Sequence, residues 1–181
     1  MPTSLWRSLD DRRLVLASLL GELEAYDELV RRYRGAVFVV TFRLLGDRAL
    51  AEDATQEALL VAFKALPQLA DPARFSAWLH AIARRHARKV AERGRKRRGQ
   101  IDELLLREVP SLRERPDPAQ RWVEAVEVRQ ALEALPEVSR LAVELMYFEG
   151  MSVRDIASFL GVTETTVKWR LHRAYELLRR E

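Results

Sequence analysis

Apolar residues recur along most of this chain at the three- and four-residue spacing of an α-helix. The clearest stripe joins Leu29, Tyr33, Val37, Val40 and Leu44. No run alternates convincingly between apolar and polar residues, and glycine and proline are scarce at seven residues each. Because an apolar stripe on a helix has to pack against another element, the pattern predicts an all-α protein.

Four helices are expected in the first half of the chain. Gly21 interrupts the first helix, and Pro67 ends the third. Between them, Gly46 stops the second helix just before Asp47, the expected N-cap of the third. The predicted helices cover residues 6–20, 22–45, 48–66 and a segment that opens at Asp71–Pro72. Residues 1–93 are interpreted as one helical domain.

The composition of the sequence changes over residues 94–118, where basic residues give way to mixed charge. Pro110, Pro116 and Pro118 break any long helix, so residues 94–118 are interpreted as a flexible linker. Residues 119–181 are predicted to form a second small domain. Its expected helices cover residues 120–135, 136–149, 152–160 and 163–180, with Pro136 as the first residue of its helix. The expected architecture is two small helical domains joined by a linker.

The last thirty residues carry the clearest functional pattern. A short helix pattern ends at Gly161, and a second begins almost at once. In the second helix, Val167, Leu171, Ala174 and Leu178 recur at helical spacing and are expected to point inward. The outward positions are polar or aromatic: Thr165, Thr166, Lys168, Trp169, His172 and Arg173. This pattern predicts a helix-turn-helix whose second helix enters the major groove of DNA.

Charge is distributed unevenly along the chain. The net charge is +4, but residues 74–98 contain ten Lys and Arg residues against a single acid, Glu92. That segment therefore carries +9, and the rest of the chain sums to −5. A local basic block favours a polyanionic partner. The alternative is a solvated helix end, which becomes less favoured beside a second DNA-binding pattern.

Several functional classes find little support in the sequence. There is no cysteine, and His80, His86 and His172 lie too far apart to form a metal set. Glycine-rich phosphate loops and nucleophile–base pairs are missing, so neither an enzyme nor a cofactor is expected. The N-terminus lacks the apolar core of a signal peptide, and apolar runs such as 36–40 are too short to span a bilayer. We therefore expect a cytoplasmic protein that does not insert into membranes.

Three stretches follow one another along the chain: Gly46–Asp47 with residues 51–57, residues 75–84, and Leu135–Pro136 with the helix-turn-helix. In this order and at this chain length, they resemble the extracytoplasmic-function (ECF) subfamily of bacterial RNA polymerase sigma factors. Gly46–Asp47 with residues 51–57 resembles the core of sigma region 2, and residues 75–84 resemble the promoter-melting segment. Leu135–Pro136 with the helix-turn-helix resembles region 4. The resemblance implies a transcription initiation factor that binds core RNA polymerase, at its clamp coiled coil and its flap. It would direct the polymerase to specific promoters, assist melting, and be held inactive by an anti-sigma factor.

The resemblance also implies roles for individual residues. Polymerase binding is implied for Asp53, Gln56, Glu57, Leu60 and Phe63. Contacts with the −10 promoter element are implied for Arg74, Trp78, Arg84, Arg85 and Arg88, together with the loop from Gln68 to Arg74. Contacts with the −35 element are implied for Thr166, Lys168, Trp169, His172 and Arg173. The chain departs from its relatives at Ala81, Arg85 and Trp169, where a basic residue, an asparagine and a small residue are usual.

Alternatives remain for several of these assignments. Asp53, Gln56 and Glu57 share one helix face and also fit a solvated acidic surface. Trp78, beside apolar neighbours, also fits a core position, and Trp169 fits packing against the linker. For the whole chain, the alternatives are a stand-alone helix-turn-helix regulator and a protein-binding adaptor with a region-2-like fold. The regulator leaves the basic block beside Trp78 unexplained.

Overall fold

The computed structural model describes residues 3–104 and 132–179. Every element in these two stretches is helical, which confirms the all-α prediction. The first stretch contains α1 (Thr3–Ser8), α2 (Asp11–Leu19), α3 (Leu23–Leu45), α4 (Arg48–Ala65), the 3-10 turns η1 (Leu66–Gln68) and η2 (Pro72–Arg74), and α5 (Phe75–Leu104). The second contains α7 (Glu137–Tyr147), α8 (Val153–Leu160) and α9 (Glu164–Leu178).

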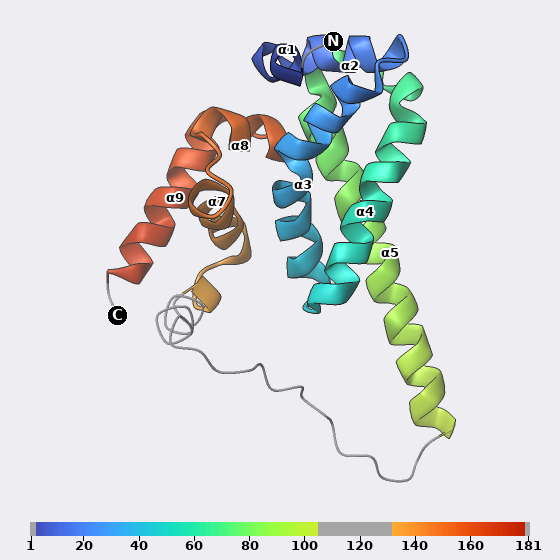
Figure 1. Ribbon diagram of the computed structural model, residues 1–181. Coiled ribbons are helices and arrows are strands. Elements are labelled where there is room, and N and C mark those ends of the chain that lie inside the picture. The colour runs from blue at the N-terminus through green and yellow to red at the C-terminus, as the bar shows by residue number, and fades with distance from the viewer. Residues whose placement is uncertain (1–2, 105–131, 180–181) are drawn as a thin grey trace, which may run out of the picture.

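Helices α3, α4 and α5 pack side by side as a bundle, and α1 and α2 cross one end of it (Figure 1). Alanines make up most of the buried side of α4, at positions 51, 54, 58 and 62. Such small side chains let helix backbones approach closely. The hydroxyls of Thr41 on α3 and Thr55 on α4 lie 2.9 Å apart in this interior and satisfy each other. The bundle therefore has a well-packed centre.

Two helix boundaries in the first described stretch differ from the sequence prediction. The helix expected over residues 6–20 is two helices, because Asp10 adopts an extended conformation and caps α2 by accepting from the Arg13 N–H at 2.8 Å. Helix α5 continues to Leu104, past the domain end expected at residue 93. Gly94 and Gly99 each cost the helix only about 1 kcal/mol relative to alanine, and the arginine and lysine residues between them favour helix. The next proline comes only at residue 110.

The C-terminal helices form the predicted helix-turn-helix. Gly161 ends α8 with a φ of 67°, which favours glycine, and Thr163 caps α9. Pro136 is the N-cap of α7, not its first helical residue as expected, because its ψ of 140° is extended. Leu132, Leu135, Val143 and Ala174 share a small core under α7 and α9. The helix expected over residues 120–135 lies mostly outside the described residues, as does much of the expected linker.

The described parts on either side of the expected linker pack against each other. Helix α8 contacts α5, and α7 contacts α3 (Figure 1). One continuous apolar cluster includes Val37 and Leu79 from the bundle together with Leu145, Ile156 and Phe159 from the C-terminal helices. The two halves thus share a core in this structure.

Candidate polymerase and nucleic-acid interfaces

The face of α4 that was assigned to polymerase is fully available to a partner. All five predicted contact residues on it are exposed: Asp53, Gln56, Glu57, Leu60 and Phe63. Leu60 is 55% exposed and Phe63 38%, although both are large and apolar. The ring of Phe63 lies 4.8 Å from that of Tyr26, whose hydroxyl donates to the Leu59 carbonyl at 2.6 Å. This ridge of acidic, amide and apolar groups suits a protein partner better than a nucleic acid.

The residues assigned to the −10 element lie on α5 and on the segment before it. Arg74, Arg84, Arg85 and Arg88 are all exposed. Trp78 is half-buried, with its ring centroid 6.1 Å from that of Phe75. One part of this indole therefore packs on the core, and the other part reaches solvent. Trp78 thus packs partly against the core, and its contact with the −10 element stays a prediction.

The cations of α5 line a groove that the sequence did not predict. Arg84, Arg85, Arg88 and Lys89 form one wall, with Glu92 as the single acid. Leu160 and Gly161, at the turn of the helix-turn-helix, form part of the other wall. The groove has a volume of about 630 Å³ and is open to solvent. Its charge suits a phosphate backbone, which arginine and lysine side chains contact.

On the outward face of α9, four of the five residues assigned to the −35 element are exposed, and Thr166 is half-buried. Lys168, Trp169, His172 and Arg173 are exposed, and Trp169 is 60% exposed. The salt bridge of Lys168 to Glu164, at 3.9 Å, and that of Arg173 to Glu176, at 3.8 Å, are surface pairs. Such pairs are weak and leave the cations free to exchange partners. Thr166 is half-buried, and its hydroxyl lies 2.9 Å from that of Thr163, so a DNA contact would compete with the helix cap.

The contact between the halves centres on Phe159 of α8, which sequence reasoning did not single out. Its side chain is fully buried, with ring centroids 6.0 Å from Tyr33 and 5.0 Å from His80. Burial, helped by the nearby charge of Arg84, lowers the pKa of His80 to about 4. His80 is therefore neutral at physiological pH. An apolar position on a short helix gives no sign of whether its partner lies in the same domain or in another.

Two polar contacts accompany Phe159. The Ser76 and Ser158 hydroxyls lie 2.7 Å apart. The Arg43 guanidinium contacts the Glu144 carboxylate at 3.0 Å, and both side chains are largely shielded from solvent. Arg43 and Glu144 are 101 residues apart along the chain, and no local pattern in the sequence pairs them.

Within the residues that the structure describes, no three acidic, histidine or cysteine side chains gather as metal ligands would. The same part of the chain contains no helix with the length and apolarity needed to cross a membrane. The surfaces whose exposed side chains have binding chemistry are the α4 ridge, the basic side of α5 and the outward face of α9.

Two family models match the chain in the expected order. Sigma-70 region 2 matches residues 29–98, and Sigma-70 region 4 matches residues 125–178. The ECF RNA polymerase sigma factor SigE of Mycolicibacterium smegmatis is 36% identical over 161 residues, which cover 87% of this chain and 61% of SigE. This chain thus spans less than two thirds of that relative.

The RNA polymerase sigma-H factor of Pseudomonas aeruginosa is 31% identical over 180 residues, covering 93% of this chain and 91% of the relative. The fold resembles that of CnrH in complex with the cytosolic domain of CnrY, with a TM-score of 0.62 and 24% identity over 94% of this chain and 95% of CnrH. The chain therefore belongs to the ECF family of RNA polymerase sigma factors.

Proposed function

We propose that this chain is a transcription initiation factor that binds core RNA polymerase, directs it to specific promoters and assists promoter melting. The observation that carries the proposal is that one chain has three separate exposed surfaces of the required chemistry, in the order that the two sigma regions require. The chain itself performs no covalent reaction and acts in the cytoplasm.

Each surface has a distinct task in this proposal. The α4 ridge, Asp53 to Phe63, docks on the clamp coiled coil of the polymerase. Arg74, Arg84, Arg85 and Arg88 contact the backbone of the melted −10 strand, and the exposed part of Trp78 offers a surface for an unstacked base. The outward face of α9 reads the −35 duplex in its major groove. Each DNA surface is small, so affinity depends on the polymerase holding both at once.

A protein regulator is part of the proposal. The relative in fold, CnrH, was solved in complex with the cytosolic domain of CnrY. We propose that this chain is held inactive by an anti-sigma factor, for which the apolar side chains of Leu60 and Phe63 on the α4 ridge offer contact area. Occupation of this ridge would exclude the polymerase.

Run-off transcription with purified core polymerase tests the proposal. Genomic promoter fragments are transcribed with and without the chain, and transcripts that start at defined sites only in its presence support it. Failure of the chain to associate with core polymerase in a pull-down would overturn it. A stand-alone helix-turn-helix regulator would instead bind duplex DNA without polymerase, and it would leave the α4 ridge without a role.

A further inference from the structure

The N-terminal helices α1 and α2 lie before the part of the chain that matches the region 2 family model, which begins at residue 29. In the structure, α2 packs against η1, against η2 and against α5. The two 3-10 turns belong to the segment from residue 66 to 74, called here the 66–74 loop. Within this loop, the family resemblance assigns residues Gln68 to Arg74 to contacts with the −10 element. Helix α2 therefore packs against the loop that is predicted to contact DNA.

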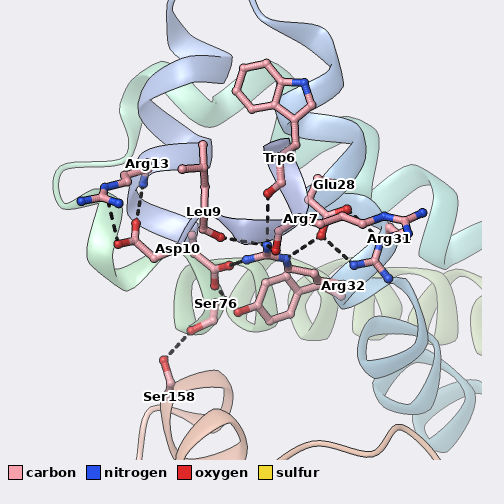
Figure 2. Close-up of polar contacts among 12 residues, drawn as sticks. Trp6, Arg7, Leu9, Asp10, Arg13, Glu28, Arg31, Arg32, Ser76 and Ser158 are labelled. Atoms are coloured by element: carbon pink, nitrogen blue, oxygen red, sulfur yellow. Dashed lines mark hydrogen bonds and ion pairs between the residues drawn. The ribbon is translucent and has the colours of Figure 1, made fainter. Parts of the chain in front are cut away.

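The pair α1–α2 is fastened to the bundle by Arg32 of α3 (Figure 2). Its guanidinium donates to three backbone carbonyls at the end of α1 and the turn after it: those of Trp6, Arg7 and Leu9, at 3.4, 3.0 and 2.8 Å. It also contacts the carboxylates of Asp11 and Glu28, each at 2.9 Å. Arg32 is largely shielded from solvent, and hydrogen bonds to charged groups are stronger than those between neutral groups. Arg32 thus fixes the position of α1 and the start of α2.

Asp11 continues this connection toward the loop. One carboxylate oxygen accepts from Arg32, and the other accepts from the hydroxyl of Tyr33. The Tyr33 ring meets the ring of Phe75 edge-on, at 5.8 Å between centroids. Phe75 is buried and directly follows the last residue of the 66–74 loop. A line of contacts therefore runs from α2 through Tyr33 to the point where the loop joins α5.

The 66–74 loop depends on such support. It contains only two single 3-10 turns, closed by the bonds from Leu69 N–H to Leu66 C=O at 3.0 Å and from Arg74 N–H to Asp71 C=O at 2.9 Å. Leu66 is buried in the same apolar cluster as Leu14 and Val15 of α2. The other side of the loop faces solvent, at Gln68, Ala70, Asp71, Ala73 and Arg74. The loop thus exposes polar and backbone groups to solvent, while Leu66 holds it against Leu14 and Val15 of α2.

We propose that α1 and α2 form a brace that sets the conformation of the 66–74 loop and thereby its selectivity for the melted −10 strand, with Asp11, Arg32 and Tyr33 as positioning residues. The inference rests on the proposed function, because it assigns the loop to that strand. In enzymes, a misplacement of about 1 Å at the reacting groups costs up to about a hundredfold in rate. Selectivity for a strand depends in the same way on where the recognition groups of the loop lie. A brace of this kind acts on selectivity without touching the nucleic acid.

The experiment compares variants of the 181-residue chain bound to core polymerase. The probe is a pool of templates with a pre-opened bubble and a randomised −10 segment, and the readout is the ratio of preferred to disfavoured sequences recovered. Asp11→Ala removes both carboxylate contacts, whereas Tyr33→Phe removes only the hydroxyl and keeps the ring against Phe75. Arg13→Ala is the matched control, since Arg13 lies on the same helix and is exposed. All assays are run well below the melting temperature of each variant.

We expect Asp11→Ala to lower the selectivity ratio about tenfold and Tyr33→Phe to lower it about threefold, with core affinity unchanged. Arg13→Ala keeps the wild-type ratio. If the Asp11→Ala variant does not fold, the selectivity ratio of the Tyr33→Phe variant alone tests the proposal. A wild-type ratio in folded variants overturns the brace and leaves the proposed function standing. A wild-type chain that selects no −10 sequence overturns the proposed function and the inference together.

Discussion

His80 is the residue in the described part of the chain whose ionisation most directly concerns the contact between the halves. Burial lowers its pKa from 6.5 to about 4, so the folded state binds a proton less readily than the unfolded state does. Between those values stability falls as pH falls, because the unfolded chain takes up the proton first. The stability is fully present above about pH 6.5 and is lost on acidification toward pH 4.

We expect the change in unfolding free energy over this window to be about 1–3 kcal/mol, allowing for the solvent that reaches the ring. The check is thermal unfolding between pH 7 and pH 4 for the wild type and for His80→Gln, which cannot take up the proton. The wild type loses more stability than the variant. Parallel pH profiles for the two proteins would show that His80 does not titrate in this window.

Arg173 offers a residue-scale test of DNA reading. Among the described residues, its guanidinium pairs with Glu176 in a 3.8 Å surface contact, which is weak enough for Arg173 to reach a base edge from α9. We expect Arg173→Ala to weaken binding of holoenzyme to its matched −35 sequence by about 1–3 kcal/mol. Equilibrium binding of labelled promoter DNA measures this loss. An equal loss on unrelated DNA would make Arg173 a phosphate contact without sequence preference.

For single residues, the sequence predicts whether a side chain is buried or exposed better than it predicts which side chains it contacts. Helical spacing correctly places Val167 and Ala174 inward and Trp169 outward, because that choice depends on local geometry alone. It does not predict that Phe159 lies against Tyr33 and His80 of the bundle. Nor does it show that the Thr166 hydroxyl is already engaged by Thr163. Such contacts depend on how whole helices dock.

At the scale of elements, α4 is the helix whose two faces differ most clearly in role. Its alanines pack into the bundle, and its acidic and apolar ridge faces solvent. Because this ridge can be altered without disturbing the core, mutations on it separate binding from folding.

We expect Asp53→Ala with Glu57→Ala to weaken association with core polymerase at least fivefold while the melting temperature stays within a few degrees, since exposed substitutions change stability little. Titration of labelled core polymerase measures the affinity. The control is Glu24→Ala with Asp27→Ala, which removes the same charge from exposed positions on α3. Equal affinities for wild type, test variant and control would contradict the assignment of α4 to the clamp.

Element boundaries were predictable where capping residues mark them. Gly46 and Asp47 end α3 and begin α4 as expected, and Asp47 accepts from the Leu50 N–H at 2.8 Å. The break at Asp10 was missed, because the apolar spacing continues across it and masks the cap. The continuation of α5 past Gly94 was missed for the opposite reason, since glycine weakens a helix without ending it. A glycine followed by a capping residue thus predicts a helix end reliably. A single glycine or a single cap does not, because the neighbouring residues also determine whether the helix continues.

At the scale of the whole molecule, the packing of the halves conflicts with simultaneous reading of both promoter elements. Elements near −10 and −35 are about 25 base pairs apart, or roughly 85 Å of B-DNA. Helix α9 has 15 residues and is about 22 Å long, and the helix-turn-helix touches α5 directly at Ser76 and Ser158. The two reading surfaces do not span that distance in this arrangement. The proposed function therefore requires the halves to separate on the polymerase.

A cross-link between the halves tests this requirement. The Ser76 and Ser158 hydroxyls are 2.7 Å apart, and the chain has no cysteine, so Ser76→Cys with Ser158→Cys introduces one defined pair. We expect the oxidised double variant to lose run-off transcription at least tenfold and to regain it on reduction, because the disulfide holds the helix-turn-helix against α5 and away from the −35 element. Each single-cysteine variant is the control and stays active under oxidant. A fully cross-linked chain that transcribes as well as the reduced one would show that the halves need not part.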